Sequence, residues 1–521
     1  MAFYGHHSSY RFLLITTLSI ILYESQSSDG LGNFGFDIHH RYSDQVKRIL
    51  DADGLPEMGS VEFYAAMAHR DRLVRQRKLA ATAPSAPLTF LGGNDTYRIR
   101  SLGYLHYANV SVGSPGLWFL VALDTGSNLF WLPCDCTRCV HALVTSSGHE
   151  IDLNIYSPNK SSTSTKLSCN STFCGQKRRC LSESNVCAYQ VQYLSNGTSS
   201  TGILVEDTLH LTTDDSRLTA VDARITFGCG LVQSGSFLSG GAPNGLFGLG
   251  MDNISVPSIL AKEGLAANSF SMCFGPDGVG RIRFGDKITT EQGETPFNLN
   301  QTHPTYNVSM TQVSLGDNVT DISFGAIFDS GTSFTYLNDP AYSAISESFN
   351  SQAQEKRHPP DDRIPFEYCY NLSANQTSFN VSSLNLTMKG GKQFHVTHPI
   401  VTIPIEGEGY LYCLAIIESG DINIIGQNFM TGYRIVFDRE KMVLGWESSN
   451  CYDAEKSSTS PVNPPEPSAI PPTSGGGNGS PIPSPRPSSS ASDFLHLYSF
   501  PCTLFLVFIS LFGPYFSSSS P

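Results

Sequence analysis

The chain has 521 residues, 13 cysteines and a formal net charge of −13. Its length allows roughly three or four domains of average size, or fewer if the fold is all-β. Only 15% of the residues are charged, against about 25% in an ordinary globular protein. The acidic balance argues against nucleic acid, which needs a basic face, and gives no support for a polybasic membrane contact. The many cysteines indicate an oxidising compartment.

The first predicted element is an apolar run of 12 residues from Phe12 to Tyr23. Polar residues with one arginine precede it, and small polar residues follow at 25–28. This layout predicts a secretory signal peptide over residues 1–27, because the run is too short for a comfortable membrane span. A buried helix is the alternative.

The body of the chain, from 100 to 450, consists of short β-type runs separated by Gly, Pro and Asn turns, which predicts a large all-β body. Two helical segments are expected, at 257–264 and 340–350. The expected strands include 107–112, 118–123, 189–194, 223–230, 281–286, 325–331 and 433–438.

A weak internal duplication runs through this body. An apolar strand ends in Asp-Thr-Gly-Ser at 118–127, and a second ends in Asp-Ser-Gly-Thr at 324–333. An apolar strand ending in Gly follows each motif, at 244–250 and at 422–429. Two copies of one unit predict two homologous lobes, with their boundary near 275–300.

The duplicated motif places Asp124 and Asp329 each on a tight turn at the end of an apolar strand. The glycines after them, Gly126 and Gly331, let the backbone turn and let the partner loop approach. Two carboxylates that meet cannot both ionise cheaply, so the pair holds one proton in acid and titrates as a unit. One carboxylate can then take a proton from water while the other protonates a peptide carbonyl. The hydroxyls expected to fix the outer carboxylate oxygens are those of Thr125, Ser127, Ser330 and Thr332.

Twelve cysteines remain when Cys502, near the C-terminus, is set aside. An even number in a secreted protein predicts disulfides, with local pairing within 134–187, Cys229 joining that group, and long-range pairs among the rest. The Cys136–Cys139 spacing could also indicate zinc or redox chemistry, but the secretory context favours a structural disulfide, and no metal is expected. The twelve are Cys134, Cys136, Cys139, Cys169, Cys174, Cys180, Cys187, Cys229, Cys273, Cys369, Cys413 and Cys451.

The C-terminal region begins with a Ser, Pro, Gly and Asn-rich stretch at 453–493, which predicts an extended stalk. An apolar tail at 494–516 follows, with no basic residues after it. Small residues, a polar spacer and a terminal apolar tail indicate a GPI-anchor signal, with Asn478 and Ser489 as candidate attachment residues. A tail anchor that spans the membrane and a plain secreted protein are the alternatives.

Fourteen Asn-x-Ser/Thr sequons lie between Asn94 and Asn478, four of them between 371 and 387. Each marks a surface position if the chain is secreted. Asn109 and Asn307 fall in strand-like runs and are expected to lie too close to the sheet for use.

These motifs resemble those of the pepsin-like aspartic proteases, and in detail those of their atypical plant branch, which includes nepenthesin-like and nucellin-like GPI-anchored proteins. The resemblance covers about 100–452 and rests on five segments in family order. They are DTGSNLFWLP at 124–133, YQVQY to STGILVEDTL at 189–209, NGLFGLG at 244–250, FDSGTSF at 328–334 and YRIVFDREKMVLGW at 433–446.

The resemblance implies an all-β, bilobal fold with the cleft between the lobes, and endopeptidase activity at acidic pH without a cofactor. It implies that Asp124 and Asp329 are the catalytic pair, that Tyr193 belongs to a mobile flap, and that Trp131 lies behind it. An ordinary cross-strand aromatic and a core indole are the plain alternatives for these two. The flap segment is longer than in pepsin and carries a sequon at Asn196, and the seven cysteines of 134–187 form an insertion typical of the plant branch.

The family also implies that residues 28–90 are a prosegment. The stretch from His69 to Ala80 packs basic residues into an acidic protein, either as a solvated helix face or as cations that cover the acidic cleft until low pH releases them. The predicted division is therefore a signal peptide at 1–27, a prosegment at 28–90, an N-terminal lobe at 91–280, a C-terminal lobe at 281–452, a stalk at 453–493 and a removed tail at 494–521.

Three functions remain open on the sequence. The first is an aspartic endopeptidase, monomeric and GPI-anchored to the outer face of the plasma membrane, with polypeptide substrates. The second is a non-catalytic binding or inhibitor protein on the same fold, although both Asp-x-Gly motifs are intact. The third, an adhesion-type glycoprotein, leaves the paired motif unexplained.

Overall fold

The computed structural model describes residues 32–50, 56–79, 103–452 and 468–469, with short gaps inside the third range. The chain divides into two units, Met1–Ile470 and Pro471–Pro521, and every described residue lies in the first. The predicted signal peptide, most of the stalk and the apolar tail therefore lie outside the described residues. The gaps are 145–147, 149, 175–178, 182, 194–196, 215–216, 300–303, 373–375, 377, 380–381, 406, 408 and 421.

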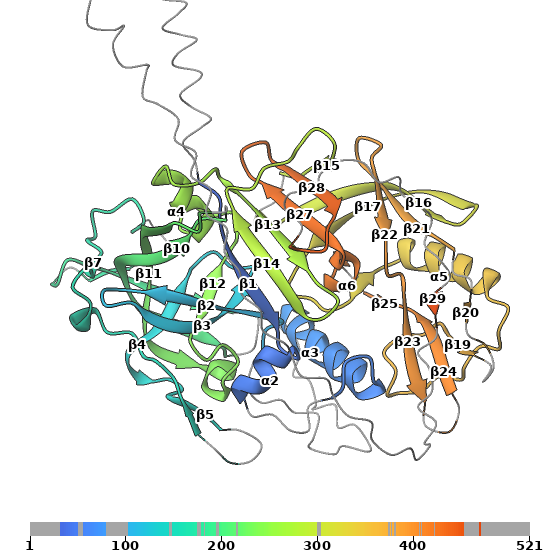
Figure 1. Cartoon of the computed structure of the whole chain (residues 1–521), viewed down its shortest axis with the longest axis horizontal. Helices are drawn as coiled ribbons and strands as arrows, with labels where there is room; N and C mark the ends of the chain where they lie inside the picture. The colour runs from blue at the N-terminus through green and yellow to red at the C-terminus, as the bar shows by residue number, and fades with distance from the viewer. Residues whose placement is uncertain are drawn as a thin grey trace, which may run out of the picture. The chain divides into compact units, whose positions relative to one another are not determined.

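Within the described residues, the largest element is a 15-stranded sheet that runs through both lobes (Figure 1). In sheet order its strands are β15 (Gly293–Pro296), β28 (Val443–Ser448), β27 (Tyr433–Asp438), β13 (Ser269–Phe274), β14 (Val279–Phe284), β1 (Phe34–His40), β2 (His106–Val112), β3 (Leu117–Asp124), β12 (Leu246–Gly248), β4 (Trp131–Arg138), β11 (Ala220–Ser234), β10 (Ser199–Thr212), β9 (Val186–Gln192) and β8 (Arg179–Leu181), with β7 (Thr165–Lys166) beside β10.

The C-terminal lobe has its own sheets. A seven-stranded sheet has the order β22 (Gln393–Val396), β21 (Leu384–Met388), β16 (Asn307–Leu315), β17 (Asn318–Phe328), β26 (Ile424–Ile425), β18 (Thr335–Leu337) and β25 (Ile416–Glu418). A three-stranded sheet joins β19 (Cys369–Leu372), β24 (Gly409–Leu414) and β23 (Ile400–Ile405), and two-stranded sheets join β20 (Ser378–Phe379) to β29 (Ser468–Ala469) and β5 (Ala142–Val144) to β6 (Glu150–Asp152).

Helices are few among the described residues, as the sequence predicts. The two helices expected in the body are present as α4 (Val256–Lys262) and α5 (Ala341–Gln352). The others are α2 (Asp44–Leu50), α3 (Val61–Leu79), α6 (Gln427–Met430) and the 3₁₀ turns η2 (Pro158–Lys160) and η3 (Gly235–Ser239). The all-β, bilobal prediction is confirmed.

The strands follow from the sequence pattern. β10 alternates between buried and more exposed positions along most of its length, as expected of a strand with one face on the core. β3 is different, because residues 119–123 are all buried, and a continuous apolar run is typical of a strand covered on both faces. The strand that ends in Asp124 is therefore rigidly held.

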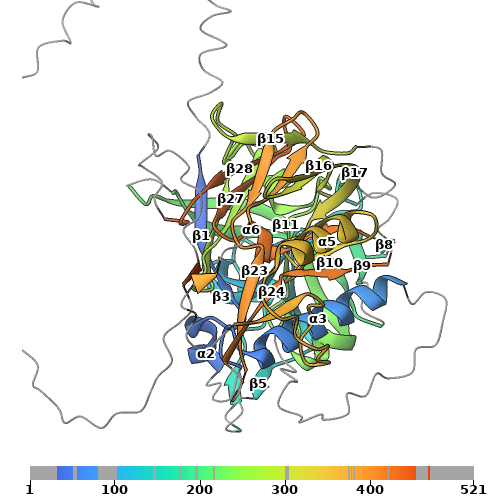
Figure 2. The same cartoon turned by 90° about the vertical axis from the view of Figure 1, so that its right-hand side faces the viewer.

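The segment before the body is part of the fold. β1 pairs antiparallel with β14 from Phe34↔Phe284 to His39↔Val279, and with β2 at His39↔Tyr107 and His40↔His106. Its Phe34 and Ile38 side chains are buried in the main core. α3 packs at one end of the C-terminal lobe, beside β23 (Figures 1 and 2). The sequence predicted a prosegment here and did not reveal the strand β1.

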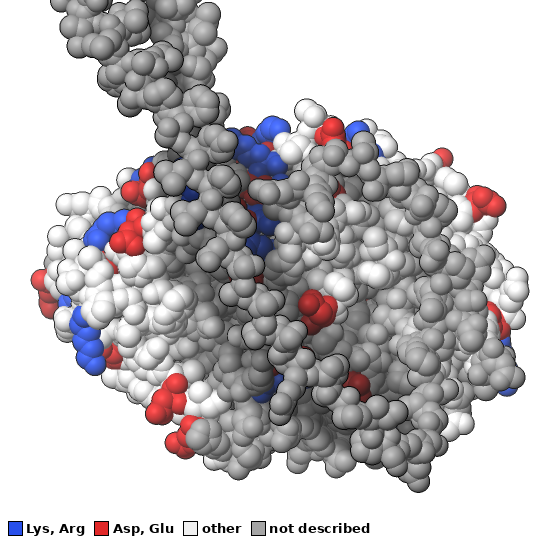
Figure 3. All heavy atoms as spheres, viewed as in Figure 1, with Lys and Arg blue, Asp and Glu red and all other residues white. Residues whose placement is uncertain are grey.

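On the face shown in Figure 3, the acidic and basic side chains of the described residues lie interspersed. None of the described helices is both long enough and apolar enough to cross a membrane.

Candidate active site

The first aspartate, Asp124, is the last residue of β3. Its backbone carbonyl accepts a hydrogen bond from Leu249 N–H at 2.9 Å, just after β12, which pairs parallel with β3 at Gly248↔Asp124. Gly126 N–H donates to Asp124 Oδ1 at 2.9 Å. The sheet fixes the backbone of Asp124, and the tight turn fixes one oxygen of its carboxylate.

The second aspartate, Asp329, directly follows β17 and repeats this arrangement. Its N–H donates to Ile425 O at 3.1 Å, where β26 pairs parallel with β17. Gly331 N–H donates to Asp329 Oδ1 at 2.8 Å, and Thr332 Oγ1 donates to Asp329 Oδ2 at 2.8 Å. The internal duplication inferred from sequence therefore has matching geometry in the two lobes.

Two glycines allow the downstream strands to lie against these turns. A Cβ atom on Gly248 would lie 2.4 Å from the carbonyl carbon of Asn128, and one on Gly426 would lie 2.2 Å from Phe334 O. Both distances are far inside van der Waals contact, so no larger residue fits without moving the loop. Gly248 lies within the first downstream apolar run noted in the sequence, 244–250, and Gly426 lies within the second, 422–429.

The two turns meet across the lobes. Thr125 Oγ1 and Ser330 Oγ lie 3.4 Å apart, although 205 residues separate them in sequence. Both side chains are buried, at 6% and 3% exposure. Residues directly after the two aspartates are thus in contact, which brings both Asp-x-Gly turns into one site.

The support from hydroxyl groups differs from the prediction. All four hydroxyls were expected to fix carboxylate oxygens. Thr332 donates to the Asp329 carboxylate, whereas Thr125 and Ser330 lie within hydrogen-bonding distance of each other. Ser127 Oγ is buried and has no hydrogen-bond partner within the described part of the chain. The prediction is wrong for Ser127 because its hydroxyl, unlike that of Thr332, does not reach an acceptor.

Tyr193 and Trp131 lie together beside the first aspartate. Trp131 Nε1 donates to Tyr193 Oη at 2.7 Å, and the Tyr193 ring makes an edge contact with Phe237 at 5.1 Å. Burial and then the negative charge of Asp124 raise the pKa of Tyr193. The phenol therefore stays protonated beside the carboxylate, and the roles of flap tyrosine and supporting indole stay predictions.

A second tyrosine, Tyr104, was missed by the sequence analysis. Burial and then the charges of Asp124 and Tyr193 raise its pKa. Its backbone N–H donates to Tyr107 Oη at 3.0 Å. No motif marks Tyr104 in the sequence, because it lies just before the first recognisable strand of the body.

The N-terminal helix α3 reaches the loop that follows Asp329. Arg70 Nη1 donates to Gly331 O at 2.5 Å, and Arg70 Nε donates to Gly103 O at 2.9 Å. The basic stretch 69–80 was expected to cover the cleft with its cations. The structure shows that one of them, Arg70, binds a backbone carbonyl two residues after Asp329.

An acidic residue anchors this helix more extensively. Asp71 has a fully buried side chain, and it accepts hydrogen bonds from Ser333 N–H at 2.9 Å and from Ser333 Oγ at 2.8 Å. It also accepts from Phe334 N–H at 3.3 Å and Tyr336 Oη at 3.2 Å, and pairs with Arg70 at 2.9 Å. Burial raises the pKa of Asp71, while Arg70 and the bonds from Ser333 lower it. The sequence analysis missed this anchor because a single acid within a basic stretch carries no signal.

The twelve cysteines of the body form six disulfides, in the two groups expected from the sequence. Cys136 and Cys139 lie with His141 in the one cluster of described residues that could hold a metal ion, but their sulfurs are joined to each other and are not thiolate ligands. The pairs are Cys134–Cys229, Cys136–Cys139, Cys169–Cys180, Cys174–Cys187, Cys273–Cys451 and Cys369–Cys413. The GPI candidates Asn478 and Ser489 lie outside the described residues.

Comparisons with known proteins show the family to which this chain belongs. The Xylanase inhibitor N-terminal family model matches residues 106–286, and the Xylanase inhibitor C-terminal family model matches residues 305–448. Aspartyl protease family protein 1 of Arabidopsis thaliana is 59% identical over 473 residues, covering 90% of this chain and 92% of its own. This chain belongs to the atypical plant branch of the pepsin-like aspartic protease family.

Other members of this aspartic protease family are similar over most of the chain. Aspartic proteinase-like protein 1 of Arabidopsis thaliana is 39% identical and covers 88% of this chain and 89% of its own, and aspartic proteinase nepenthesin-2 of Nepenthes gracilis is 25% identical and covers 66% and 77%. Among solved structures, conglutin gamma from lupine seeds has a TM-score of 0.52 at 18% identity, over 67% of this chain and 92% of its own. Basic 7S globulin from soybean has a TM-score of 0.51 at 21% identity, over 67% and 94%. At these identities the likeness to the two structures shows only that the fold is shared.

Proposed function

We propose that this protein is an aspartic endopeptidase that hydrolyses peptide bonds with a water molecule held between Asp124 and Asp329. One carboxylate takes a proton from the water while the other donates a proton to the carbonyl oxygen of the peptide. The hydrated intermediate then breaks at the C–N bond as a proton passes to the leaving amine. Two carboxylates that share one proton work in acid, so the enzyme is expected to be active at acidic pH.

The observation that carries this proposal is the contact between the two Asp-x-Gly turns. The turns have the same Gly-to-carboxylate hydrogen bond, at 2.9 Å for Asp124 and 2.8 Å for Asp329, and they meet through Thr125 and Ser330. A protein that only binds its partner needs no such pairing of acids. Each turn keeps its aspartate and its glycine, and non-catalytic relatives usually lose one of these residues.

A non-catalytic binding or inhibitor function is the second candidate. It is favoured by the matching family models, which are described as xylanase inhibitors. The relatives with the higher identity carry protease names instead. Polypeptide substrates therefore fit the family better than a single inhibited partner.

Peptide cleavage tests the two candidates directly. The activated protein and its Asp124→Asn variant are incubated with a peptide library at about pH 4, and Asp321→Asn serves as the matched control, since Asp321 is an exposed residue of β17. We expect cleavage by the wild type and by Asp321→Asn, and none above background by Asp124→Asn. Equal turnover by all three proteins, or none by the wild type after the N-terminal segment is removed, would favour the binding function.

The proposed site of action is the cell surface. The N-terminal apolar run, the six disulfides and the sequons support secretion. The stalk and the terminal apolar tail support a GPI anchor on the outer face of the plasma membrane, with one copy of the chain acting alone. Treatment of intact cells with a phosphatidylinositol-specific phospholipase should release the protein, and a protein that stays in the membrane fraction would favour a spanning tail.

A further inference from the structure

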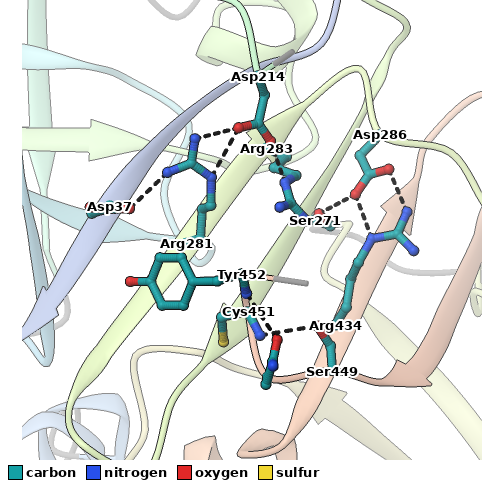
Figure 4. Close-up of polar contacts among 11 residues, drawn as sticks. Asp37, Asp214, Ser271, Arg281, Arg283, Asp286, Arg434, Ser449, Cys451 and Tyr452 are labelled. Atoms are coloured by element: carbon teal, nitrogen blue, oxygen red, sulfur yellow. Dashed lines mark hydrogen bonds and ion pairs between the residues drawn. The ribbon is translucent and has the colours of Figure 1, made fainter. Parts of the chain in front are cut away.

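The outer surface of the 15-stranded sheet differs from one part of the sheet to another. Where β1, β14, β13 and β27 lie side by side, polar side chains bind one another, as Figure 4 shows. Arg281 Nη1 donates to Asp37 Oδ1 at 2.7 Å, and Arg434 Nε donates to Asp286 Oδ2 at 2.6 Å. On the hairpin of β2 and β3, in contrast, an apolar side chain faces the solvent, because Trp118, the second residue of β3, is 62% exposed.

Trp118 is the exposed member of the chain's three tryptophans. Trp131 is fully buried, and Trp446 is 4% exposed. An indole is a large apolar group, so its exposure leaves much apolar area in water. A neighbouring group that covers the ring would therefore lower the free energy of the folded chain.

The asparagine of a glycosylation sequon lies on the same face of this hairpin. Ser111 is directly opposite Trp118 in the sheet, and Asn109 is two residues before Ser111 on β2. Since alternate residues of a strand point to one face, the three side chains project from the same face. Asn109 and Trp118 are therefore diagonal neighbours at about 7–8 Å, a distance that aromatic side chains can span.

The two sequon asparagines that the sequence placed in strand-like runs differ in the structure. Asn109 is the exposed residue in the middle of β2, and its side-chain amide makes no hydrogen bond with the described part of the chain. Asn307 of β16 is half-buried, and its Oδ1 accepts a hydrogen bond from Asn298 Nδ2 at 2.5 Å. Both were expected to lie too close to the sheet for use, and only the position of Asn307 agrees with that expectation.

We propose that Asn109 carries an N-linked glycan and that the first sugar of this glycan stacks on the indole of Trp118. One face of an N-acetylglucosamine ring carries only C–H groups, and this face fits the electron-rich face of an indole. The glycan thereby shields the exposed tryptophan of the chain from water. The inference rests on the proposed secretion of the chain, but not on peptide hydrolysis.

The covalent step is the transfer that any Asn-x-Ser/Thr sequon can undergo in the secretory pathway. The side-chain amide nitrogen of Asn109 bonds to C1 of the sugar, the C1–O bond to a lipid pyrophosphate donor breaks, and the amide loses one proton while the lipid pyrophosphate leaves. The Ser111 hydroxyl completes the sequon and is buried in the folded chain, at 7% exposure. Because transfer takes place on the entering chain, before β2 pairs with β3, this burial is no obstacle.

Acrylamide quenching of tryptophan fluorescence on the full secreted chain tests the contact. The signal reports Trp118, because the other two tryptophans are buried. The chain is produced with high-mannose glycans, which are then either cut back to the first sugar by an endoglycosidase or removed completely by a peptide N-glycosidase. We expect mass spectrometry to show a glycan on Asn109. We expect the quenching constant to be unchanged after trimming to the first sugar and to rise about twofold after complete removal, since one of the two ring faces becomes free.

Three variants assign the signal. Asn109→Gln lacks the glycan and should show the higher quenching constant before either treatment. Asn253→Gln is the matched control, because Asn253 is an exposed sequon asparagine in the turn before α4, and it should behave as the wild type does. Trp118→Phe should abolish the response to complete removal. Both enzymatic treatments act on the folded wild type, so the proposal stays testable if Asn109→Gln does not fold.

Several results would overturn the proposal. One is a bare Asn109 in a chain whose other sequons are occupied, and another is a quenching constant that complete removal of the glycans leaves unchanged. A chain with no occupied sequon would contradict the secretion on which the inference rests. Since no peptide hydrolysis is measured, failure of this inference and failure of the protease function are distinguishable.

Discussion

The two aspartate turns have the same local geometry but different surroundings. In both, a glycine N–H holds the inner carboxylate oxygen, at 2.9 Å for Asp124 and 2.8 Å for Asp329. In the second turn Thr332 also donates to the outer oxygen of Asp329, whereas the corresponding hydroxyl of the first turn, Ser127 Oγ, has no partner among the described residues. The duplication preserved the turn and changed what supports it.

The N-terminal helix increases this difference. Asp71 binds the backbone and side chains of residues 333–336, and Arg70 binds Gly331 O, so α3 is attached to the second turn. The first turn is flanked instead by Tyr193 and Trp131 of the body. The second turn is therefore where the N-terminal segment controls the site, and changes in the two turns should have unequal effects.

The largest expected effect comes from Asp71→Asn. This change leaves the buried Arg70 cation unpaired and weakens the bonds to Ser333, and loss of one partner of a buried ion pair costs about 3–5 kcal/mol. We expect α3 to exchange its amide hydrogens rapidly even at neutral pH, while β1 stays protected. Asp44→Asn is the control, because the Asp44 side chain is 90% exposed. Unchanged protection of α3 would mean that Asp71 does not anchor it.

Thr332→Val should have the next largest effect. It removes the 2.8 Å hydrogen bond to the Asp329 carboxylate, and a bond to a charged group contributes about 1.5–3 kcal/mol. We expect kcat/KM for a peptide to fall about 10- to 100-fold, since about 1.4 kcal/mol corresponds to a factor of ten. Thr332→Ser keeps the hydroxyl and should retain most of the activity. An equal loss in both variants would point to packing of the methyl group.

Tyr193→Phe tests the support of the first turn. The change leaves the buried Trp131 Nε1–H without its 2.7 Å acceptor, which should lower the free energy of unfolding by about 1–2 kcal/mol. Denaturant unfolding measures this loss, with Tyr452→Phe as a control on a half-exposed tyrosine. Equal free energies of unfolding in the two variants would show that Trp131 Nε1–H donates to water or to another acceptor.

Ser127→Ala should have the smallest effect. Its hydroxyl makes no hydrogen bond with the described residues, so its removal leaves no protein group unpaired and should change kcat/KM by about twofold or less. Comparison with Thr332→Val under the same conditions measures the asymmetry of the turns. A loss as large as that of Thr332→Val would show that the two turns are equivalent in the working enzyme.

The sequence predicts the two strand-and-turn units that carry Asp124 and Asp329, and the physical reason is local. β3 and β17 are apolar runs that end in Asp-x-Gly, and the glycine conformation and strand pairing follow from neighbouring residues. The two helices predicted in the body are also confirmed. They could be predicted because a helix depends mainly on residues that are close in sequence. The disulfide groups follow from the order of the cysteines along the chain.

The contacts of the N-terminal segment with the site and with the sheet could not be predicted in the same way. Asp71 contacts residues 262 positions away, and its role depends on burial that no local pattern reveals. β1 joins the sheet between β14 and β2, which lie far apart in sequence. His40 and His106 become a pair only through that strand pairing. Because these features arise from long-range contacts, the family resemblance implied only a prosegment with a basic stretch.

The central claim is that Asp124 and Asp329 act as one catalytic unit. The most direct test compares peptide hydrolysis at about pH 4 by Asp124→Asn, Asp329→Asn and the double variant, after removal of the N-terminal segment. Because each carboxylate is useless without the other, we predict that each single variant loses at least about 10³-fold in kcat/KM and that the double variant loses no more. Losses that multiply in the double variant, or a single variant that keeps its activity, would contradict the account.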